Sequence, residues 1–218
     1  MTTATYSAIS SYSRVQILHT LQKRGQRTIT DLREATGLHA NTVREHVQRL
    51  IDIGYIVAET EHRTTRGRPR VLYSAASGTR TASPIAVRKA REAAERGDLM
   101  RRIMPWTDTT DAALPTDAVH QIDALVEDLV DAGFDPAIDE STLTVDISPC
   151  PHAEAAPEHR DTLCAVHLML MDAVLSQAGG PLRVDAMAAS CDPRQCVVRL
   201  MLAQRDAAAP APTLAATR

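Results

Sequence analysis

Amphipathic helices separated by glycine-containing turns constrain the N-terminal part of this 218-residue chain more than any other feature. In residues 13–21 the apolar side chains recur at three- and four-residue steps, which predicts a helix that buries one face. The apolar positions are Val15, Ile17, Leu18 and Leu21, and polar residues, Arg14 among them, fill the outer positions. We therefore expect a first helix that ends near Gly25.

Two further helices follow closely. Residues 28–37 predict a short helix in which Thr30 is the expected N-cap and Gly37 supplies the left-handed turn. Residues 39–53 predict a third helix, which ends before Gly54. Its buried side is expected to consist of Val43, Val47, Leu50 and Ile51. A helix, a glycine-containing turn and a second helix together predict a helix-turn-helix.

The outer side of the third helix carries groups that match the edges of DNA bases. Amide and guanidinium groups pair with base edges in the major groove, and threonine contacts a phosphate or a thymine methyl group. The residues expected to contact DNA are Asn41, Thr42, Arg44, Glu45 and Arg49. An ordinary solvent-exposed helix face is the alternative interpretation.

An arginine-rich hairpin follows the third helix. Residues 55–60 and 70–74 alternate between apolar and polar side chains, which predicts two paired strands. The residues of this hairpin expected to contact DNA are Arg63, Arg66, Arg68 and Arg70. Arginines on such a tip enter the narrow minor groove or lie along phosphates, so the hairpin is interpreted as a wing.

The charge of the chain is divided unevenly along its length. Residues 1–80 hold 12 basic and 6 acidic residues, a net charge of +6, whereas residues 81–218 hold 12 and 21, a net charge of −9. A basic segment is what neutralisation of DNA phosphates requires, so we expect double-stranded DNA to contact the first 80 residues. With only 3% aromatic residues the chain is poorly suited to stacking on single-stranded bases.

The sequence contains no apolar run near the ~18 residues of a membrane helix and no secretory signal. We therefore expect a cytoplasmic protein with no membrane partner. Residues 74–83 have the small, polar composition of a linker, and residues 84–104 predict a helix that is interrupted near Gly97. Dimerisation is the expected role of that helix, because two-fold operators need two recognition helices, and a spacer is the alternative.

The C-terminal half alternates between predicted helices and strands. Helices are expected over residues 116–132 and 158–177, and strands over 143–147, 182–187 and 196–202. The predicted fold class is α+β, with four parts: a winged helix-turn-helix domain at 8–75, a linker and dimerisation helix at 76–115, a small α/β domain carrying the cysteines at 116–203, and a disordered tail at 204–218.

All four cysteines lie in the C-terminal half, at Cys150, Cys164, Cys191 and Cys196. Each is expected at the boundary of an element or on an exposed helix turn, and His167 lies one turn after Cys164. Thiolates in such positions suit an iron–sulfur cluster or, together with imidazole, zinc. Unliganded thiols and a redox-active disulfide remain alternatives, since no Cys-x-x-Cys pair is present.

The N-terminal pattern resembles a known family. SSYSRVQIL, GLHANTVREHVQRLIDIGYI and RGRPRVLYS, within residues 8–75, are similar to the winged-helix regulators of the ArsR-like superfamily. With the C-terminal motifs SPCPH, LCAVH and QCVVRL, the chain resembles the SufR-type branch, the iron–sulfur-sensing repressors of cluster-assembly operons.

This resemblance implies a homodimeric repressor of a palindromic operator, with a [4Fe–4S] or [2Fe–2S] cluster on Cys150, Cys164 and Cys196. The sequence departs from the family pattern in two places, since His152 replaces a common aromatic residue and Cys191 has no fixed counterpart. The fourth ligand is therefore open: Cys191 would complete an all-thiolate site, His167 is the leading substitute, and His152 is a weaker one.

Three alternatives use the same residues differently. A zinc- or thiol-redox-sensing repressor would need no cluster, and a metal-free binding domain would take a small organic effector. An enzyme would use Cys164 as nucleophile with His167 or His159 as base. The chain has no glycine-rich phosphate loop and no nucleophile-elbow motif, so we expect a regulator rather than an enzyme.

Overall fold

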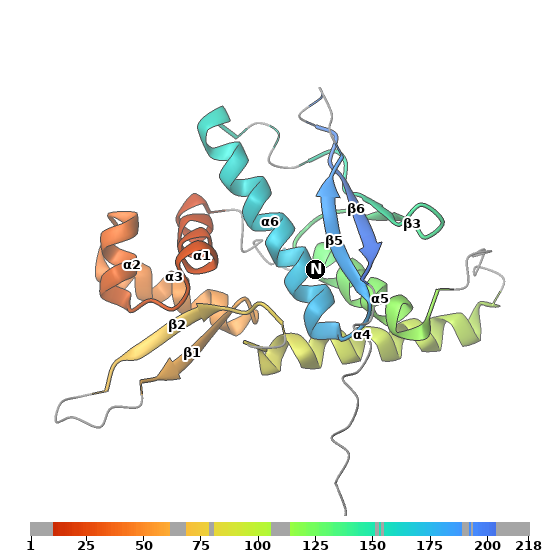
Figure 1. Cartoon of the computed structure of the whole chain (residues 1–218), viewed down its shortest axis with the longest axis horizontal. Helices are drawn as coiled ribbons and strands as arrows, with labels where there is room; N and C mark the ends of the chain where they lie inside the picture. Colours follow the sequence, from red (N-terminus) through yellow and green to blue (C-terminus); the bar gives the residue numbers. More distant parts are fainter. Residues whose placement is uncertain are drawn as a thin grey trace, which may run out of the picture.

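The computed structural model of the chain describes residues 11–61, 69–78, 81–105, 114–150, 153, 155–188, 192 and 194–203. It consists of a winged-helix unit (residues 11–75), a long connecting helix, and a C-terminal unit (residues 114–203) in which helices pack on a sheet (Figure 1). The structure thus confirms a mixed helix and sheet fold with an N-terminal winged helix-turn-helix. The predicted tail at 204–218 lies outside the described residues.

The winged-helix unit has three helices and a hairpin. These are α1 (Tyr12–Arg24), α2 (Ile29–Thr36), α3 (Ala40–Asp52), β1 (Ile56–Thr60) and β2 (Val71–Ala75). The two strands pair antiparallel, with Ile56 opposite Ala75 and Thr60 opposite Val71. Backbone hydrogen bonds between Arg27 and Tyr73 join the start of α2 to the hairpin.

Two details of this unit differ from the sequence predictions. Thr28, rather than Thr30, caps α2, because the Thr28 hydroxyl accepts a hydrogen bond from the Asp31 amide while the Thr28 amide donates to the Asp31 carboxylate at 2.8 Å. This reciprocal pair forms a capping box and starts the helix earlier. Arg14, expected on the outer side of α1, is only 6% exposed.

The connecting helix α4 (Pro84–Ile103) is continuous, so the predicted interruption near Gly97 is wrong. A side chain at Gly97 would lie within 2.5 Å of the Asp123 carboxylate, so glycine permits close approach to the neighbouring helix and does not end α4. Ion pairs join α4 to that helix, among them Lys89 with Asp131 at 3.0 Å and Arg101 with Asp123 at 2.8 Å.

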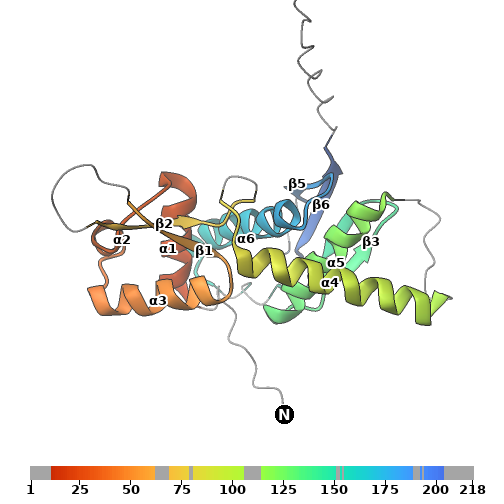
Figure 2. The same ribbon diagram turned by 90° about the horizontal axis from the view of Figure 1, so that it is seen from below.

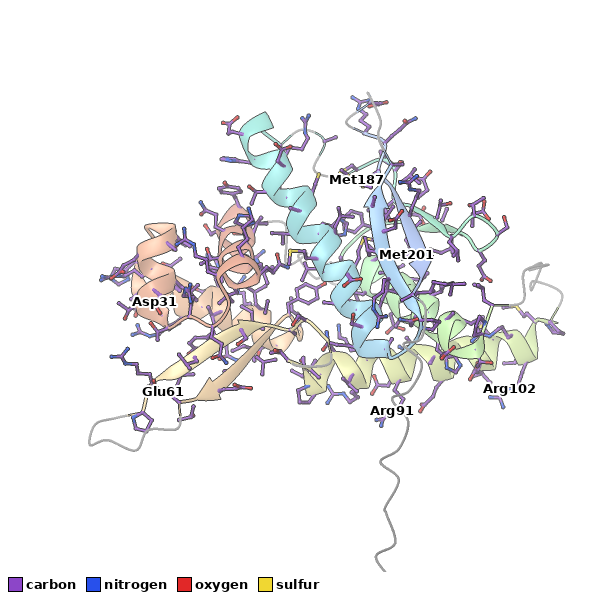
Figure 3. All side chains as sticks on the ribbon, viewed as in Figure 1. Asp31, Glu61, Arg91, Arg102, Met187 and Met201 are labelled. Atoms are coloured by element: carbon purple, nitrogen blue, oxygen red, sulfur yellow. The ribbon has the colours of Figure 1, made fainter. Side chains whose placement is uncertain are left out.

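In the C-terminal unit two helices pack against a four-stranded antiparallel sheet of order β3-β4-β6-β5. The elements are α5 (Thr116–Asp131), β3 (Ala137–Asp139), β4 (Thr144–Asp146), α6 (Pro157–Ala178), β5 (Leu182–Met187) and β6 (Val197–Leu202). Strand β3 was not predicted. Figure 3 shows Met187 and Met201 along the β5–β6 pair, where both are exposed.

Helix α6 lies between α1 and the sheet and joins the two units (Figure 1). Buried residues of α1, such as Leu18, and of α6, such as Val166, belong to one continuous hydrophobic core. At the edge of this contact Tyr12 stacks on His159, with ring centroids 3.8 Å apart. The winged-helix unit therefore packs firmly on the C-terminal unit. Within the described ranges, no helix has the length and apolar composition needed to cross a lipid bilayer.

Candidate DNA-binding surface and cysteine site

Helix α3 presents a polar side to solvent, as the sequence predicted. Asn41, Arg44, Glu45 and Arg49 are exposed, and Thr42 is half-buried. The opposite side is held in the core by Val43, Val47 and Leu50. The amphipathic spacing of α3 therefore places all five predicted residues within reach of a ligand on one side of the molecule.

Hydrogen bonds on this surface order the side chains before any ligand arrives. The Arg44 guanidinium donates to the Asn41 side-chain oxygen at 2.8 Å, and the Arg49 guanidinium donates to Glu45 at 2.9 Å. Arg49 is thereby partly neutralised, whereas Arg44 keeps its full charge next to a neutral amide. An arginine and an asparagine held together are donors and acceptors of the kind that read base edges.

Arg14 adds a positive charge beneath α3, which the sequence did not indicate. Burial lowers the pKa of Arg14, and the charge of Arg49 lowers it further. On the neighbouring turn of α3, burial lowers the pKa of His46, with Arg14 as the next cause. Arg14 thus places a largely buried guanidinium beside α3, close enough to act electrostatically on Arg49 and His46. The signal in the sequence was an arginine directly before the apolar stripe of the first helix.

The hairpin predicted as a wing is present, and its strands are paired. The tip residues Arg63, Arg66 and Arg68 lie outside the described residues. Arg70 is exposed at the loop end of the hairpin strands, where its carbonyl accepts a hydrogen bond from the Glu61 amide at 2.8 Å. Arg70 also acts electrostatically on Asp31, whose pKa is lowered mainly by its hydrogen bond with the Thr28 backbone. The loop end of the hairpin strands therefore lies close enough to the start of α2 for Arg70 to act on Asp31.

Three cysteines of the C-terminal unit come together from three elements. The Cys196 carbonyl accepts from the Ile147 amide at 2.9 Å, and the Cys150 amide donates to the Arg194 carbonyl at 2.8 Å. These bonds hold the segment after β4 against the segment before β6, and the thiols of Cys150 and Cys196 hydrogen-bond each other. Cys164 of α6 lies close enough to interact electrostatically with both. The three thiols are free of disulfide bonds.

The surroundings of these thiols are largely apolar, with the carboxylates of Asp146 and Asp161 and the guanidinium of Arg160 close enough to act on them. Burial raises the pKa of Cys196 to about 12, with further increases from Cys150, Cys164 and Asp146. Burial likewise raises the pKa of Cys164. Reactive cysteines have lowered pKa values. The pKa of Cys164 is raised although Arg160 acts against the rise, so the structure gives no support to Cys164 as a catalytic nucleophile.

The candidates for a fourth ligand are placed differently. His167 stacks on Phe134, with ring centroids 4.7 Å apart. Cys191 and His152 lie outside the described residues. Within the part of the chain that the structure describes, no group of three or more His, Cys, Asp or Glu side chains has the arrangement of a site for a single metal ion.

Comparison with known proteins identifies the N-terminal unit. Residues 11–57 match the winged helix-turn-helix DNA-binding family, and this match spans α1 to the start of β1. No curated protein matched the chain. The matched residues include the whole of α3, and the described hairpin follows directly. The chain therefore carries an N-terminal winged helix-turn-helix DNA-binding domain, which supports a role as a DNA-binding transcriptional regulator.

Proposed function

We propose that this protein is a homodimeric transcriptional repressor whose binding to a palindromic operator is controlled by an iron–sulfur cluster on Cys150, Cys164 and Cys196. The observation that carries the proposal is the meeting of three thiols, from the segment after β4, from α6 and from the segment before β6, in a chain that also carries a winged helix-turn-helix.

Thiolates suit both an iron–sulfur cluster and a zinc ion. The proposal favours the cluster because the motifs around Cys150, Cys164 and Cys196 resemble those of iron–sulfur-sensing repressors. When bound, the cluster supplies an oxygen- and redox-sensitive link between β4, α6 and β6.

Cys191 is the fourth ligand that this proposal favours. It lies five residues before Cys196 and would complete an all-thiolate set. The His167 ring is already stacked on Phe134, so ligation by His167 requires that contact to break. His152 is the weakest candidate.

Helix α4 supplies the surface proposed for the homodimer. Leu99, Met100 and Ile103 are 47%, 49% and 57% exposed and lie together on its last turns. Arg91 and Arg102 also project from this outer edge of the molecule (Figure 3). In Figure 2, α3 and α4 follow one another along the same side, so pairing through α4 would present two recognition helices on one side of the dimer.

Anaerobic reconstitution with iron and sulfide tests the proposal. The full chain is expected to become coloured, with the ultraviolet–visible absorption of an iron–sulfur cluster, and to change its affinity for duplexes that it selects from a randomised pool. Cys164→Ser is expected to lose both properties, while Met169→Ala, an exposed substitution on the same helix, keeps them.

Metal analysis of the same samples distinguishes the zinc alternative. A stoichiometric, colourless and air-stable zinc species would overturn cluster control and leave a zinc-sensing repressor. A thiol-redox sensor would respond to oxidant without any metal. Failure of the full chain to select any duplex would overturn the role in DNA binding itself.

A further inference from the structure

The end of the recognition helix is attached to the rest of the molecule at Tyr55. The Tyr55 amide donates to the Leu50 carbonyl of α3 at 2.9 Å, and the Gly54 amide donates to the Ile51 carbonyl at 2.9 Å. The Tyr55 carbonyl accepts from the Ala76 amide beyond β2 at 2.9 Å. The backbone of Tyr55 therefore moves with the last turn of α3 and with the wing.

The side chain of Tyr55 belongs to a different contact. Its hydroxyl donates to the Asp128 carboxylate of α5, with both carboxylate oxygens at 3.1 Å, although the two residues are 73 positions apart. The pair is part-buried, and it lines a pocket whose other walls come from α4 and α6. The hydrogen bond thus joins the end of the recognition helix to the C-terminal unit at a partly enclosed position.

Close packing leaves α3 little freedom at this junction. A Cβ atom at Gly54 would lie 3.0 Å from the Ala86 amide nitrogen and 3.1 Å from the Ser83 hydroxyl, so the end of α3 touches the start of α4. The Ser83 amide in turn donates to the Gln177 side chain of α6 at 2.8 Å. Rotation of α3 about its end therefore requires the bond between Tyr55 and Asp128 to change.

A series of contacts also connects Asp128 with the cysteine site, and it begins at the residue that follows Asp128. The next residue, Leu129, accepts a hydrogen bond at its carbonyl from the Phe134 amide at 2.9 Å. Phe134 stacks on His167, which lies one turn from Cys164 on α6. A continuous series of contacts thus runs from a proposed cluster ligand to the recognition helix.

We propose that Asp128 is a positioning residue for DNA binding, which through its hydrogen bond with Tyr55 fixes the angle of α3 on the C-terminal unit. The proposal rests on the proposed DNA-binding function but does not depend on the identity of the bound metal. Because the two recognition helices of a dimer must fit two half-sites at once, the angle affects two-site binding and leaves single half-site binding unchanged.

The charges around Asp128 give this contact a pH dependence. Lys89 faces it from α4, Tyr55 from the end of α3, and Glu127 and Asp131 from α5 itself; Gln177 of α6 lines the same cavity. Burial raises the pKa of Asp128 to about 6, against the opposing effects of Tyr55 and Lys89. Asp128 therefore binds a proton more readily when α3 is held against the C-terminal unit than when Asp128 is exposed to water. The packing of α3 on that unit becomes more stable as the pH falls through about 6.

Four variants of the full chain separate positioning from general stability. Tyr55→Phe and Asp128→Ala remove the hydrogen bond, whereas Asp128→Asn keeps an oxygen that accepts from the tyrosine hydroxyl. Asp135→Asn is the matched control, since it removes one exposed carboxylate charge just beyond the same helix, from a residue that is not among the groups acting on Asp128. Each is measured on two-site and half-site duplexes selected by the wild type, and by hydrogen exchange of residues 50–56.

We expect Tyr55→Phe and Asp128→Ala to weaken two-site binding at least fivefold, to leave half-site binding within twofold, and to speed exchange at residues 50–56 while α1 stays protected. Asp128→Asn should bind as tightly as the wild type at pH 5 and more tightly at pH 8. Unchanged exchange and unchanged two-site binding in Tyr55→Phe would overturn the proposal. Selection of no duplex by the wild type would overturn the DNA-binding function instead, and the exchange measurement would still decide the positioning role.

Discussion

In the winged-helix unit, the N-termini of α2 and α3 are capped by side chains only a few residues away in the sequence. In the C-terminal unit, α5 and α6 are held together by hydrogen bonds between residues that are far apart in the sequence. Thr28 and Asp31 cap α2 reciprocally, and the His39 ring accepts from the Asn41 amide at the start of α3. In contrast, Gln121 of α5 is fully buried and joins α6 to β5. Local caps fix where a helix lies in the chain, while distant contacts fix how the helices lie on one another.

The shared hydrophobic core gives the first and largest test of this contrast. Leu50→Ala in α3 and Leu175→Ala in α6 each empty a fully buried position of one continuous core. We expect each to lower the free energy of unfolding by about 2–5 kcal/mol. In urea titrations both should move the same single transition, as followed by circular dichroism in the far and the near ultraviolet. Two separate transitions would mean that the units fold independently.

Gln121→Ala tests the distant contacts directly. The Gln121 amide donates to the Leu175 carbonyl at 2.7 Å, and its oxygen accepts from the Leu182 amide at 2.7 Å. Loss of these partners leaves buried backbone groups unsatisfied, so we expect a cost of about 2–3 kcal/mol in thermal unfolding. Gln48→Ala, at an exposed position of α3, should stay within about 0.5 kcal/mol.

Arg44→Ala tests whether α3 can lose a base contact without any loss of stability in the winged-helix unit. Because Arg44 is exposed and held by Asn41, its loss should weaken binding to the selected duplex by about 1–3 kcal/mol and leave the free energy of unfolding nearly unchanged. Arg88→Ala removes the same charge from α4 and serves as the control. Equal losses of binding in both variants would indicate a general charge effect, with no base contact by Arg44.

Thr28→Ala tests the local caps. Removal of the hydroxyl should cost about 1 kcal/mol, since the Asp31 amide loses its partner. Thr30→Ala should have a much smaller effect, and unfolding followed by far-ultraviolet circular dichroism compares the two. A larger cost for Thr30→Ala would contradict the observed start of α2.

The two units should also respond to acid with opposite sign. Asp31 has a lowered pKa, chiefly through its hydrogen bond with the Thr28 backbone, so the stability that it contributes is lost only as the pH falls below about 4. Asp128 has a pKa raised to about 6 by burial, so acidification from pH 7.5 to 5 should stabilise the wild type relative to Asp128→Asn. Urea titrations at both pH values measure this small difference, and its absence would mean that Asp128 is well hydrated.

The same contrast explains what could be predicted from the sequence. The helices and hairpin of the winged-helix unit were predicted because apolar periodicity and glycine-containing turns are local signals. Strand β3 was missed because three residues carry too little periodicity, and Gly97 was misread because its close neighbour, Asp123, lies on another helix. The cysteine positions were visible, but the meeting of Cys164 with Cys150 and Cys196 depends on the packing of α6, which no local pattern contains.

The packing of α1 on α6 also limits how this protein can be rearranged. Because α1 and α6 contribute to one core and Tyr12 stacks on His159, residues 11–75 expressed alone would expose an apolar strip to water. Fusion of this unit to a different sensory domain would need a replacement for α6. The winged-helix unit is thus not an independent domain. Exchange of this unit between related regulators is expected to succeed only when α6 is transferred with it.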